Sequence, residues 1–352
     1  MVVDGPAQQG NRIVIVATYE DRPANWIGLK LLVLSLARHC PFMPVHVFVR
    51  EGQADLRNWL RRQPNVAELV EFACSARGWD VKPRVLQNRL AVGHRDVLWM
   101  DSDIIVTRDF SGLIGRLPLD VFLATEEIYW GKQPRGSEAR TEAMGLEVGR
   151  KIRETLNSSV IRTTVHHRDL LEAWTLQTNR AEYCAAQAMP FRERPICFRT
   201  DQDLLTGLLG STQYAQIPVQ LLRRGRDIAH CYRDYGYTVI DRLRNLRRGL
   251  PPLVHGMGPP KPWLVSTRLH DQLSPYSCAA KAYTGAVRES MEWVMPHSHS
   301  AWFLHCLTVG NPNLRDLPLV LVKELKLHGR ARLANLWRAI ARRASQRPID
   351  RL

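Results

Sequence analysis

Two carboxylates that flank one small residue carry the strongest chemical signal in this sequence. Asp101, Ser102 and Asp103 follow the apolar run 97–100 and precede the apolar run 104–106. Short apolar runs are typical of buried strands, and open α/β sheets bind ligands just beyond the carboxyl ends of their strands. Two carboxylates this close repel each other unless a cation lies between them. The pattern predicts a hard divalent cation shared with a substrate's phosphates; the alternative is a plain polar turn.

Alternating strands and helices are expected to position these carboxylates. Apolar runs predict strands at 12–17, 45–49, 97–100, 121–125 and 252–254, and helical spacing predicts helices at 25–38, 55–62, 82–91 and 168–176. This alternation is typical of a nucleotide-binding α/β fold. No GxGxxG follows the first strand, which removes the main support for a dinucleotide-dependent oxidoreductase. The polar, glycine-containing segment 126–150 predicts a loop or lid. Thr200 and Asp203 have the spacing of a capping box that begins a further helix.

A second motif follows the last predicted strand. Residues 255–263 read His-Gly-Met-Gly-Pro-Pro-Lys-Pro-Trp, which has the form HxxGxxKPW and is too rich in Gly and Pro for anything but a constrained loop. Upstream of it stand Asn157-Ser158-Ser159-Val160 and Asp201-Gln202-Asp203. Together with the carboxylate pair, and in this order, these motifs resemble glycosyltransferase family 8. That family comprises retaining sugar transferases of the GT-A fold, including bacterial galactosyltransferases and glycogenin.

The resemblance covers residues 12–263 and implies a fold, a domain division and a function. The implied fold is α/β, a Rossmann-like GT-A nucleotide-sugar-binding fold with a central mixed sheet flanked by helices. Residues 12–263 would form the catalytic domain, and 264–352 a linker followed by a basic helical extension. The implied function is metal-dependent transfer of a sugar, with retention, from a nucleotide-sugar to a hydroxyl acceptor. A UDP-sugar is the default donor, and a cell-envelope glycan or glycolipid is the expected acceptor.

The resemblance also implies roles for residues of the two principal motifs. Asp101, Asp103 and His255 would bind Mn²⁺ or Mg²⁺; two oxygens and one imidazole nitrogen leave positions on an octahedral ion for the donor's diphosphate. Lys261 matches the family lysine that reaches the diphosphate. Gly258 matches a glycine that lets the backbone approach phosphate closely.

Further residues are implied to contact the donor. Ser102 and Asn157 match donor-contacting positions, although Ser159 replaces the glycine that the family often has after them. Arg84, 17 positions before Asp101, matches a basic donor-contacting residue; a solvated charge on a helix face is its alternative.

The nucleobase pocket is the poorest match, with Thr18 and Tyr19 as its candidates, so uridine rests on the resemblance alone. Asp201 and Gln202 match positions beside the donor's anomeric carbon. The choice between front-face attack near Gln202 and a covalent intermediate on Asp201 stays open.

Composition constrains the partners. The chain has 352 residues, a net charge of +15 and a pI near 9.9, which suggests an acidic partner. Its seven scattered cysteines contain no CxxC and fit a reducing compartment. No stretch is long and apolar enough for a transmembrane helix, so a cytoplasmic location is expected. Residues 316–352 carry nine lysines and arginines against three acids, which predicts docking at the inner face of an anionic membrane; a helix packed on the core is the alternative.

Two other functions account for parts of the sequence. A sugar nucleotidyltransferase would share the sheet and the carboxylates, but it needs a glycine-rich basic loop after the first strand, and residues 18–21 do not provide one. A nucleic-acid-binding protein would explain the net charge, but no nucleic-acid motif occurs. No nucleic-acid partner is therefore expected.

Overall fold

A seven-stranded mixed sheet forms the centre of the computed structural model, which describes residues 13–74, 76, 78–128, 133–232, 236–264, 274–290 and 297–313. The strands are β1 (Ile15–Tyr19), β2 (Val45–Val49), β3 (Val66–Glu71), β4 (Asp96–Met100), β5 (Ile104–Val106), β6 (Phe122–Glu126), β7 (Leu156–Thr164), β8 (Val219–Leu222), β9 (Ile228–His230) and β10 (Leu253–His255). The helices are α1 (Trp26–His39), α2 (Ala54–Arg61), α3 (Lys82–Ala91), α4 (Ser111–Gly115), α5 (Glu138–Ala143), α6 (Arg168–Thr178), α7 (Ala181–Ala188), α8 (Asp201–Gly210), α9 (Val239–Asn245), α11 (Ser274–Ala280), α12 (Thr284–Glu289) and α13 (His297–Thr308).

The large sheet has the order β3-β2-β1-β4-β7-β6-β8. β1 pairs in parallel with β2 and β4, whereas β7 runs antiparallel to both β4 and β6. β4 is therefore an interior strand, and all five of its residues are buried, as its apolar sequence requires. The expected α/β fold with a central mixed sheet flanked by helices is confirmed.

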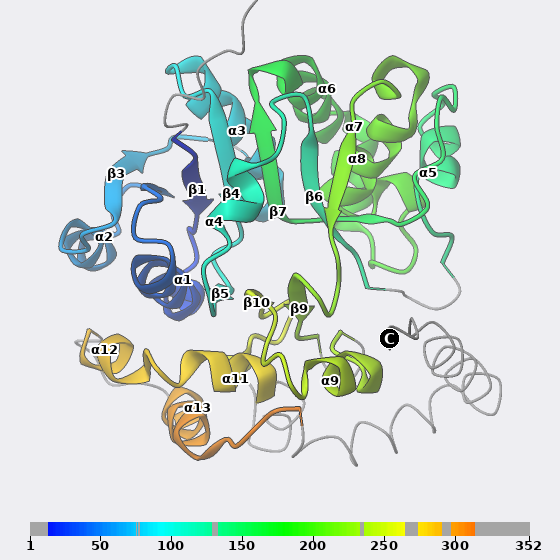
Figure 1. Ribbon diagram of the computed structural model, residues 1–352. Coiled ribbons are helices and arrows are strands. Elements are labelled where there is room, and N and C mark those ends of the chain that lie inside the picture. Colours follow the sequence, from blue (N-terminus) through cyan, green and yellow to red (C-terminus); the bar gives the residue numbers. More distant parts are fainter. Residues whose placement is uncertain are drawn as a thin grey trace, which may run out of the picture.

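Helices cover both faces of this sheet (Figure 1). Apolar side chains of α1 and α2 pack on one face in a core that includes Leu32 and Trp59. Apolar side chains of α3, α6 and α8 pack on the other face in a core that includes Leu86 and Trp174. The expected helix at 82–91 is confirmed as α3, and the expected strand at 45–49 is confirmed as β2.

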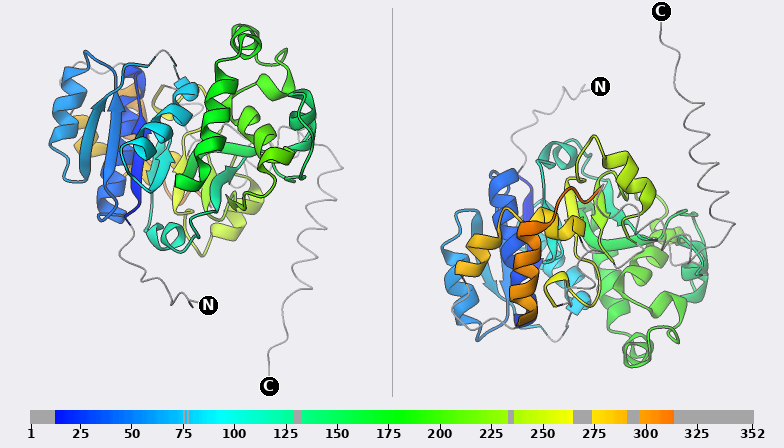
Figure 2. Two further views of the ribbon diagram at one scale, coloured as in Figure 1. Left: turned by 90° about the horizontal axis from the view of Figure 1, so that it is seen from above. Right: turned by 90° about the horizontal axis from the view of Figure 1, so that it is seen from below.

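A second sheet of three strands, in the order β5-β10-β9, lies beside the carboxyl end of β4 (Figures 1 and 2). The chain enters it directly after Asp101–Asp103, because β5 begins at Ile104. Helix α1 packs closely under this turn at Gly28. A Cβ on Gly28 would lie 2.6 Å from the Trp263 ring and 3.0 Å from the carbonyl oxygen of Ser102. Any larger residue at position 28 would push these two segments apart.

The apolar core continues past Trp263. The segment 264–296 was expected to be a linker, but within it 274–280 and 284–289 form α11 and α12. Tyr276 and, from α13, Trp302 are buried against Trp263, with ring centroids 6.0 Å and 6.1 Å from its own. Low local hydrophobic periodicity hid these short helices, whose residues Tyr276 of α11 and Val287 of α12 are buried in the same apolar cluster as Trp263. The basic segment 316–352 lies outside the described residues.

Two smaller expectations are corrected. Residues 138–143, expected to belong to a loop, form α5, which is held because Arg140 pairs with Asp203 on α8 at 2.7 Å. Thr200 precedes α8 but does not cap its backbone; its Oγ1 donates instead to Asp203 Oδ2 at 2.9 Å. The seven cysteines are free. In the part of the chain that the structure describes, no helix has both the length and the apolar character needed to cross a membrane.

Candidate active site

The carboxylates of Asp101 and Asp103 face the imidazole of His255, the last residue of β10. His255 Nε2 lies 3.3 Å from Asp103 Oδ1 and 3.9 Å from Asp101 Oδ2, and one ligand atom from each of the three lies within 4.8 Å of the other two. Asp103 and His255 are buried, whereas Asp101 is partly exposed. We call these three residues the carboxylate–histidine cluster. Two carboxylate oxygens and one imidazole nitrogen form a donor set that Mn²⁺ or Mg²⁺ accepts.

Hydrogen bonds to three separate segments fix the turn that carries the carboxylates. The backbone N–H of Asp101 donates to a carbonyl of β7 at 2.8 Å, and the N–H of Gly256 donates to the carbonyl of Asp103 at 2.9 Å. Ser102 Oγ donates to Glu20 Oε2, just beyond β1, at 2.6 Å. The side chain of Ser102 is therefore committed to holding the turn.

A second histidine sets the tautomer of His255. His230 Nε2 lies 3.1 Å from the carbonyl oxygen of Glu126, and His230 Nδ1 lies 3.0 Å from His255 Nδ1. Burial, reinforced by the neighbouring His255, holds the pKa of His230 well below its usual range, so its ring is neutral. A neutral His230 that donates through Nε2 accepts through Nδ1, and His255 Nδ1 must carry the proton. With a proton on Nδ1, His255 Nε2 is the ring nitrogen that faces the two carboxylates, an arrangement that fits a cation between them.

Lys82, the first residue of α3, is a buried cation beside the cluster. Its Nζ lies 3.0 Å from Asp101 Oδ1 and 3.8 Å from Asp201 Oδ2, and it donates to Ser158 Oγ at 2.8 Å. Burial alone would lower the pKa of Lys82, but the two carboxylates outweigh burial and raise that pKa. Burial raises the pKa of Asp201 to about 7, although Lys82 opposes this shift. Lys82 thus links the carboxylate of β4 to that of α8.

The loop after β10 brings a second lysine to the cluster. Lys261 Nζ contacts Asp103 Oδ2 and donates to the carbonyl of Gly256 at 3.1 Å. Burial acts to raise the pKa of the Asp103 carboxyl, but Lys261 and His255 outweigh burial and hold it well below its usual range. Gly258 has φ +68°, and a Cβ there would lie 2.5 Å from the Tyr232 ring. The loop therefore requires glycine at that position.

The side-chain amides of Asn157 and Gln202 both contact the carboxylate of Glu127, a residue outside the sequence motifs. Asn157 Nδ2 donates to Glu127 Oε2 at 2.9 Å, and Gln202 Nε2 contacts the same oxygen. Burial raises the pKa of the Glu127 carboxyl, while the hydrogen bonds from these amides act to lower it. Gln202 is partly exposed, whereas Asp201 is only 2% exposed. Of the two neighbouring side chains on α8, only Gln202 is accessible to a ligand.

Arg84 lies apart from this group of residues. Its Nη1 donates to the carbonyl of Asp80 at 2.9 Å, and its Nη2 contacts Asn179, just beyond α6. Lys82, two positions earlier on the same helix, lies beside Asp101 instead. Two residues correspond to about 200° of helix rotation, which is why the two basic side chains leave α3 in nearly opposite directions.

The nucleobase candidates at the end of β1 are both buried. Tyr19 lies in the core, where its hydroxyl accepts a hydrogen bond from Arg50 Nε at 3.0 Å, and burial raises its pKa to about 12. This burial leaves little ring surface for a nucleobase. Thr18 is fully buried, and among the described residues its Oγ1 has no hydrogen-bond partner.

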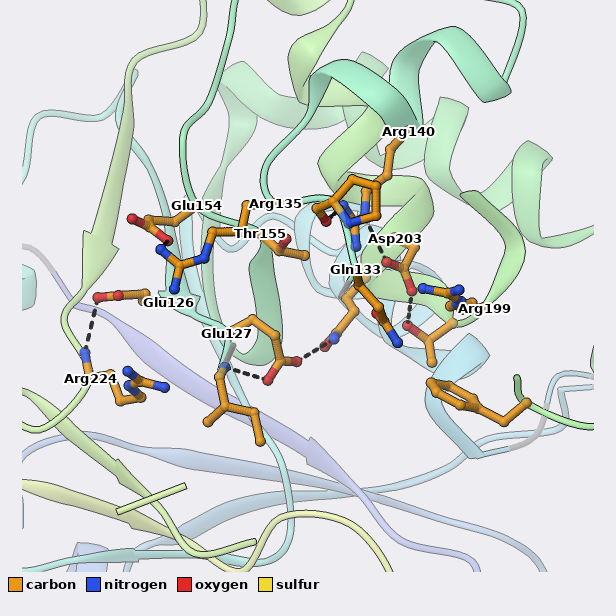
Figure 3. A pocket seen from close by; sticks show the side chains of 15 residues that line it. Glu126, Glu127, Gln133, Arg135, Arg140, Glu154, Thr155, Arg199, Asp203 and Arg224 are labelled. Carbon is orange, nitrogen blue, oxygen red and sulfur yellow. Dashed lines mark hydrogen bonds and ion pairs between the residues drawn. The ribbon is translucent and has the colours of Figure 1, made fainter. Parts of the chain in front are cut away.

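A pocket of about 560 Å³ that is open to solvent adjoins Gln202 (Figure 3). Its lining comes from residues 126–128 at the end of β6, from 133–135 and 154–155, from Arg199, Thr200, Gln202 and Asp203 around the start of α8, and from Arg140, Phe191 and Arg224. Glu127 and Gln202 belong both to this lining and to the group that bonds Asn157. The backbone N–H of Ser158 donates to Gln202 Oε1 at 3.4 Å, and Ser158 Oγ accepts from Lys82, which lies beside Asp101, so hydrogen bonds connect the pocket to the carboxylate–histidine cluster.

The sequence did not single out Lys82, Glu127 or His230. Lys82 and the predicted Arg84 belong to one expected helix, so its phase against the central strand was the only signal that could have separated them. Glu127 directly follows β6, in the same way as Asp101 follows β4, and the strand-end rule could have found it. His230 is the last residue of a three-residue strand that the apolar pattern did not reveal.

Several solved structures that resemble this chain are glycosyltransferases. The bifunctional glycosyltransferase WbbM aligns at 14% identity over 81% of this chain and 53% of its own, with a TM-score of 0.49. The galactosyltransferase LgtC, solved with donor and acceptor sugar analogues, aligns at 16% identity over 82% of this chain and 99% of its own, with a TM-score of 0.48. Glycosyltransferase GlyE of Streptococcus pneumoniae TIGR4 aligns at 13% identity over 90% of this chain and 64% of its own, with a TM-score of 0.42.

This chain therefore spans about half the length of WbbM. No protein-family model and no curated protein matches the sequence. At these scores the likeness alone decides neither activity nor substrate, so the functional argument rests on the site.

Proposed function

We propose that this protein is a metal-dependent retaining glycosyltransferase that transfers a sugar from a nucleotide-sugar to a hydroxyl acceptor. The observation that carries the proposal is the carboxylate–histidine cluster, in which His255 Nε2 faces two carboxylates. The order of motifs shared with glycosyltransferase family 8 supports the same function. A UDP-sugar as donor, Mn²⁺ as the ion and a cell-envelope glycan or glycolipid as acceptor belong to this proposal through that resemblance.

The residues around the cluster suit the departure of a nucleoside diphosphate. A divalent cation held by Asp101, Asp103 and His255 would supply Lewis-acid stabilisation to the leaving group. Lys261, whose ammonium contacts Asp103 from a flexible stem, can exchange that contact for a phosphate oxygen. Lys82 keeps its charge in a buried position, where it balances the negative charges of Asp101 and Asp201.

Accessibility favours front-face attack over a covalent intermediate on Asp201. Asp201 is 2% exposed and accepts a hydrogen bond from Ser158 Oγ at 2.9 Å, so its carboxylate is not free to reach an anomeric carbon. Gln202 is partly exposed at the pocket, but an amide is a poor nucleophile. Gln202 therefore suits binding and orientation of the donor sugar, with the leaving phosphate assisting the acceptor hydroxyl, and Asp201 supports the site from its buried position. Asn157 would help to orient Gln202, because both side chains bond to Glu127 Oε2.

A donor screen tests the proposal. The full-length protein is incubated with Mn²⁺ and with UDP-, GDP- or ADP-sugars, and release of the nucleoside diphosphate is measured. Slow hydrolysis of one class of nucleotide-sugar, abolished by EDTA, is the expected result. Retention is tested by the anomeric configuration of the glycoside that forms with a trapping alcohol. No hydrolysis of any donor, or hydrolysis unaffected by EDTA, would contradict the metal-dependent transferase.

Peripheral membrane binding is a further proposal, and it rests on the charge of residues 316–352. Each basic residue near an anionic surface contributes about 1 kcal/mol. We expect the full-length protein to sediment with anionic liposomes, less so with added salt. Replacement of the segment's Lys and Arg residues by Gln should abolish sedimentation and preserve donor hydrolysis. Equal sedimentation of the two proteins would contradict the proposal.

A further inference from the structure

The pocket beside Gln202 contains two guanidinium groups that have no partner in the described part of the chain. Arg199 Nε and Nη1 are both buried and make no hydrogen bond there. Arg224 lines the same pocket, and its side chain makes no hydrogen bond or ion pair among these residues; only its backbone N–H does, to Glu126 at 3.3 Å. Figure 3 shows Arg224 at one side of the pocket and Arg199 at the other, with Glu127 between them.

The acidic side chains of the lining form no ion pair with the side chains of Arg199 and Arg224 among the described residues. Asp203 is paired with Arg140 at 2.7 Å, and Glu154 lies 3.8 Å from Arg135. Glu127 accepts from the backbone N–H of Ile128 at 2.6 Å through Oε1, and from two amides through Oε2. The lining contains four arginines and four acids, but among the described residues none of these acids pairs with the side chain of Arg199 or Arg224.

The Glu126 carboxylate is likewise engaged, by Arg223 at 3.8 Å and by the backbone of the next residue. Buried guanidinium donors without acceptors are costly, and planar guanidinium groups bind carboxylates and phosphates in a bidentate manner. An anionic ligand in the pocket would supply the acceptors that these guanidinium groups lack among the described residues.

We propose that this pocket binds a sugar unit that carries a carboxylate or phosphate group, held between Arg199 and Arg224. The inference rests on the proposed glycosyltransferase function and names the substrate class of its sugar site. The anion is not the diphosphate of the donor, because the cation site and Lys261 that would receive the diphosphate do not line the pocket. Phe191, 49% exposed on the lining, offers an apolar face on which a sugar ring can stack.

Binding to the full-length protein tests the pocket without any turnover. Glucuronate and glucose 6-phosphate are titrated against the protein in the absence of metal, with glucose and the methyl ester of glucuronate as neutral counterparts. We expect the charged sugars to bind at least about tenfold more tightly than the neutral ones. Arg199→Gln and Arg224→Gln should each remove this preference. Arg61→Gln, which removes an exposed arginine on α2, is the matched control and should preserve it.

Two arms distinguish the source of the anion. If UDP-glucuronate is hydrolysed about tenfold faster than UDP-glucose and Arg199→Gln abolishes the difference, the charge belongs to the donor sugar. If hydrolysis shows no such preference but arginine-dependent binding of the charged sugars persists, the charge belongs to the acceptor. Equal binding of charged and neutral sugars by the wild-type protein would overturn the inference and leave the transferase standing. Arginine-dependent binding without hydrolysis of any nucleotide-sugar would instead overturn the proposed function.

Discussion

Two groups of three potential metal ligands lie within the described residues, and their charge balance differs. The carboxylate–histidine cluster is one; His46, Glu68 and His94, which we call the histidine–glutamate group, are the other. In the second group Arg89 Nη1 lies 2.5 Å from Glu68 Oε2 and 3.0 Å from His46 Nδ1. One guanidinium thus balances one carboxylate. Around the cluster, the three carboxylates of Asp101, Asp103 and the adjacent Asp201 share two lysines of the described residues, Lys82 and Lys261, besides the imidazole of His255.

The two groups also lie at opposite ends of the strands. Asp101 follows the carboxyl end of β4, where α/β sheets bind ligands. His46 and Glu68 lie near the beginnings of β2 and β3. Both groups have suitable ligand types within reach of one another, so residue type and proximity do not decide which group binds a cation. The balance of charge and the end of the sheet do.

Removal of a carboxylate should give the largest difference in activity between the two groups. Asp101→Asn or Asp103→Asn is expected to lower Mn²⁺-dependent donor hydrolysis about a thousandfold, because the charge of the leaving diphosphate is no longer compensated. Glu68→Gln removes the carboxylate of the histidine–glutamate group and should leave the rate unchanged. Initial rates of nucleotide release measure all three variants. Similar losses from both groups would erase the distinction.

Replacement of the cationic side chain beside either group should destabilise the protein, but only the replacement beside the carboxylate–histidine cluster should lower donor hydrolysis. Lys82→Met leaves the partly buried Asp101 without its partner, at a cost of about 3 kcal/mol in the free energy of unfolding. Arg89→Met leaves Glu68 without its partner, but the Glu68 side chain is 45% exposed, so the cost should be smaller, about 1 kcal/mol. Denaturant unfolding measures both costs. Only Lys82→Met should also lose donor hydrolysis under conditions where the protein is folded. Loss of hydrolysis in folded Arg89→Met would show that the histidine–glutamate group supports the active site.

Acid should destabilise the histidine–glutamate group. Burial lowers the pKa of His46 to about 4, whereas an unfolded histidine has a pKa of about 6.5. Between these values only the unfolded chain binds the proton, so the free energy of unfolding falls as the pH drops below about 6.5, by about 2 kcal/mol from pH 7 to pH 5 for this residue. His46→Asn should remove that share of the pH dependence, and the exposed His166→Asn should not. Identical pH dependence in His46→Asn and wild type would contradict the neutral, structural role of His46.

The smallest effect concerns the tautomer of His255. His230→Phe removes the acceptor of the His255 Nδ1 proton and is expected to weaken Mn²⁺ binding about tenfold. His94→Phe, in the histidine–glutamate group, should leave it unchanged. Electron paramagnetic resonance of free Mn²⁺ measures both affinities without any turnover. Unchanged Mn²⁺ affinity in folded His230→Phe would exclude this positioning role.

The sequence by itself determined the features that depend on residues close together in the chain. The runs 45–49 and 82–91 have the periodicity of a strand and of a helix, and the structure has the same bounds. The carboxylates at the end of β4 followed from the same local patterns, whereas the mixed sheet was implied by the family resemblance. The three residues predicted as metal ligands also lie together, because β5 pairs with β10 and so brings His255 beside the carboxylate turn.

Only the tertiary structure decided which groups face one another from distant segments. The phase of α3 against β4 selected Lys82 and turned Arg84 away. The pairing of β9 with β10 set His230 against His255, and the start of α8 brought Arg199 to the pocket shared with Arg224. The aromatic contacts of Trp263 drew 274–290 into the core. A local pattern specifies the type of an element and its buried face, but the rotation and partners of that element depend on packing against residues far away in the sequence.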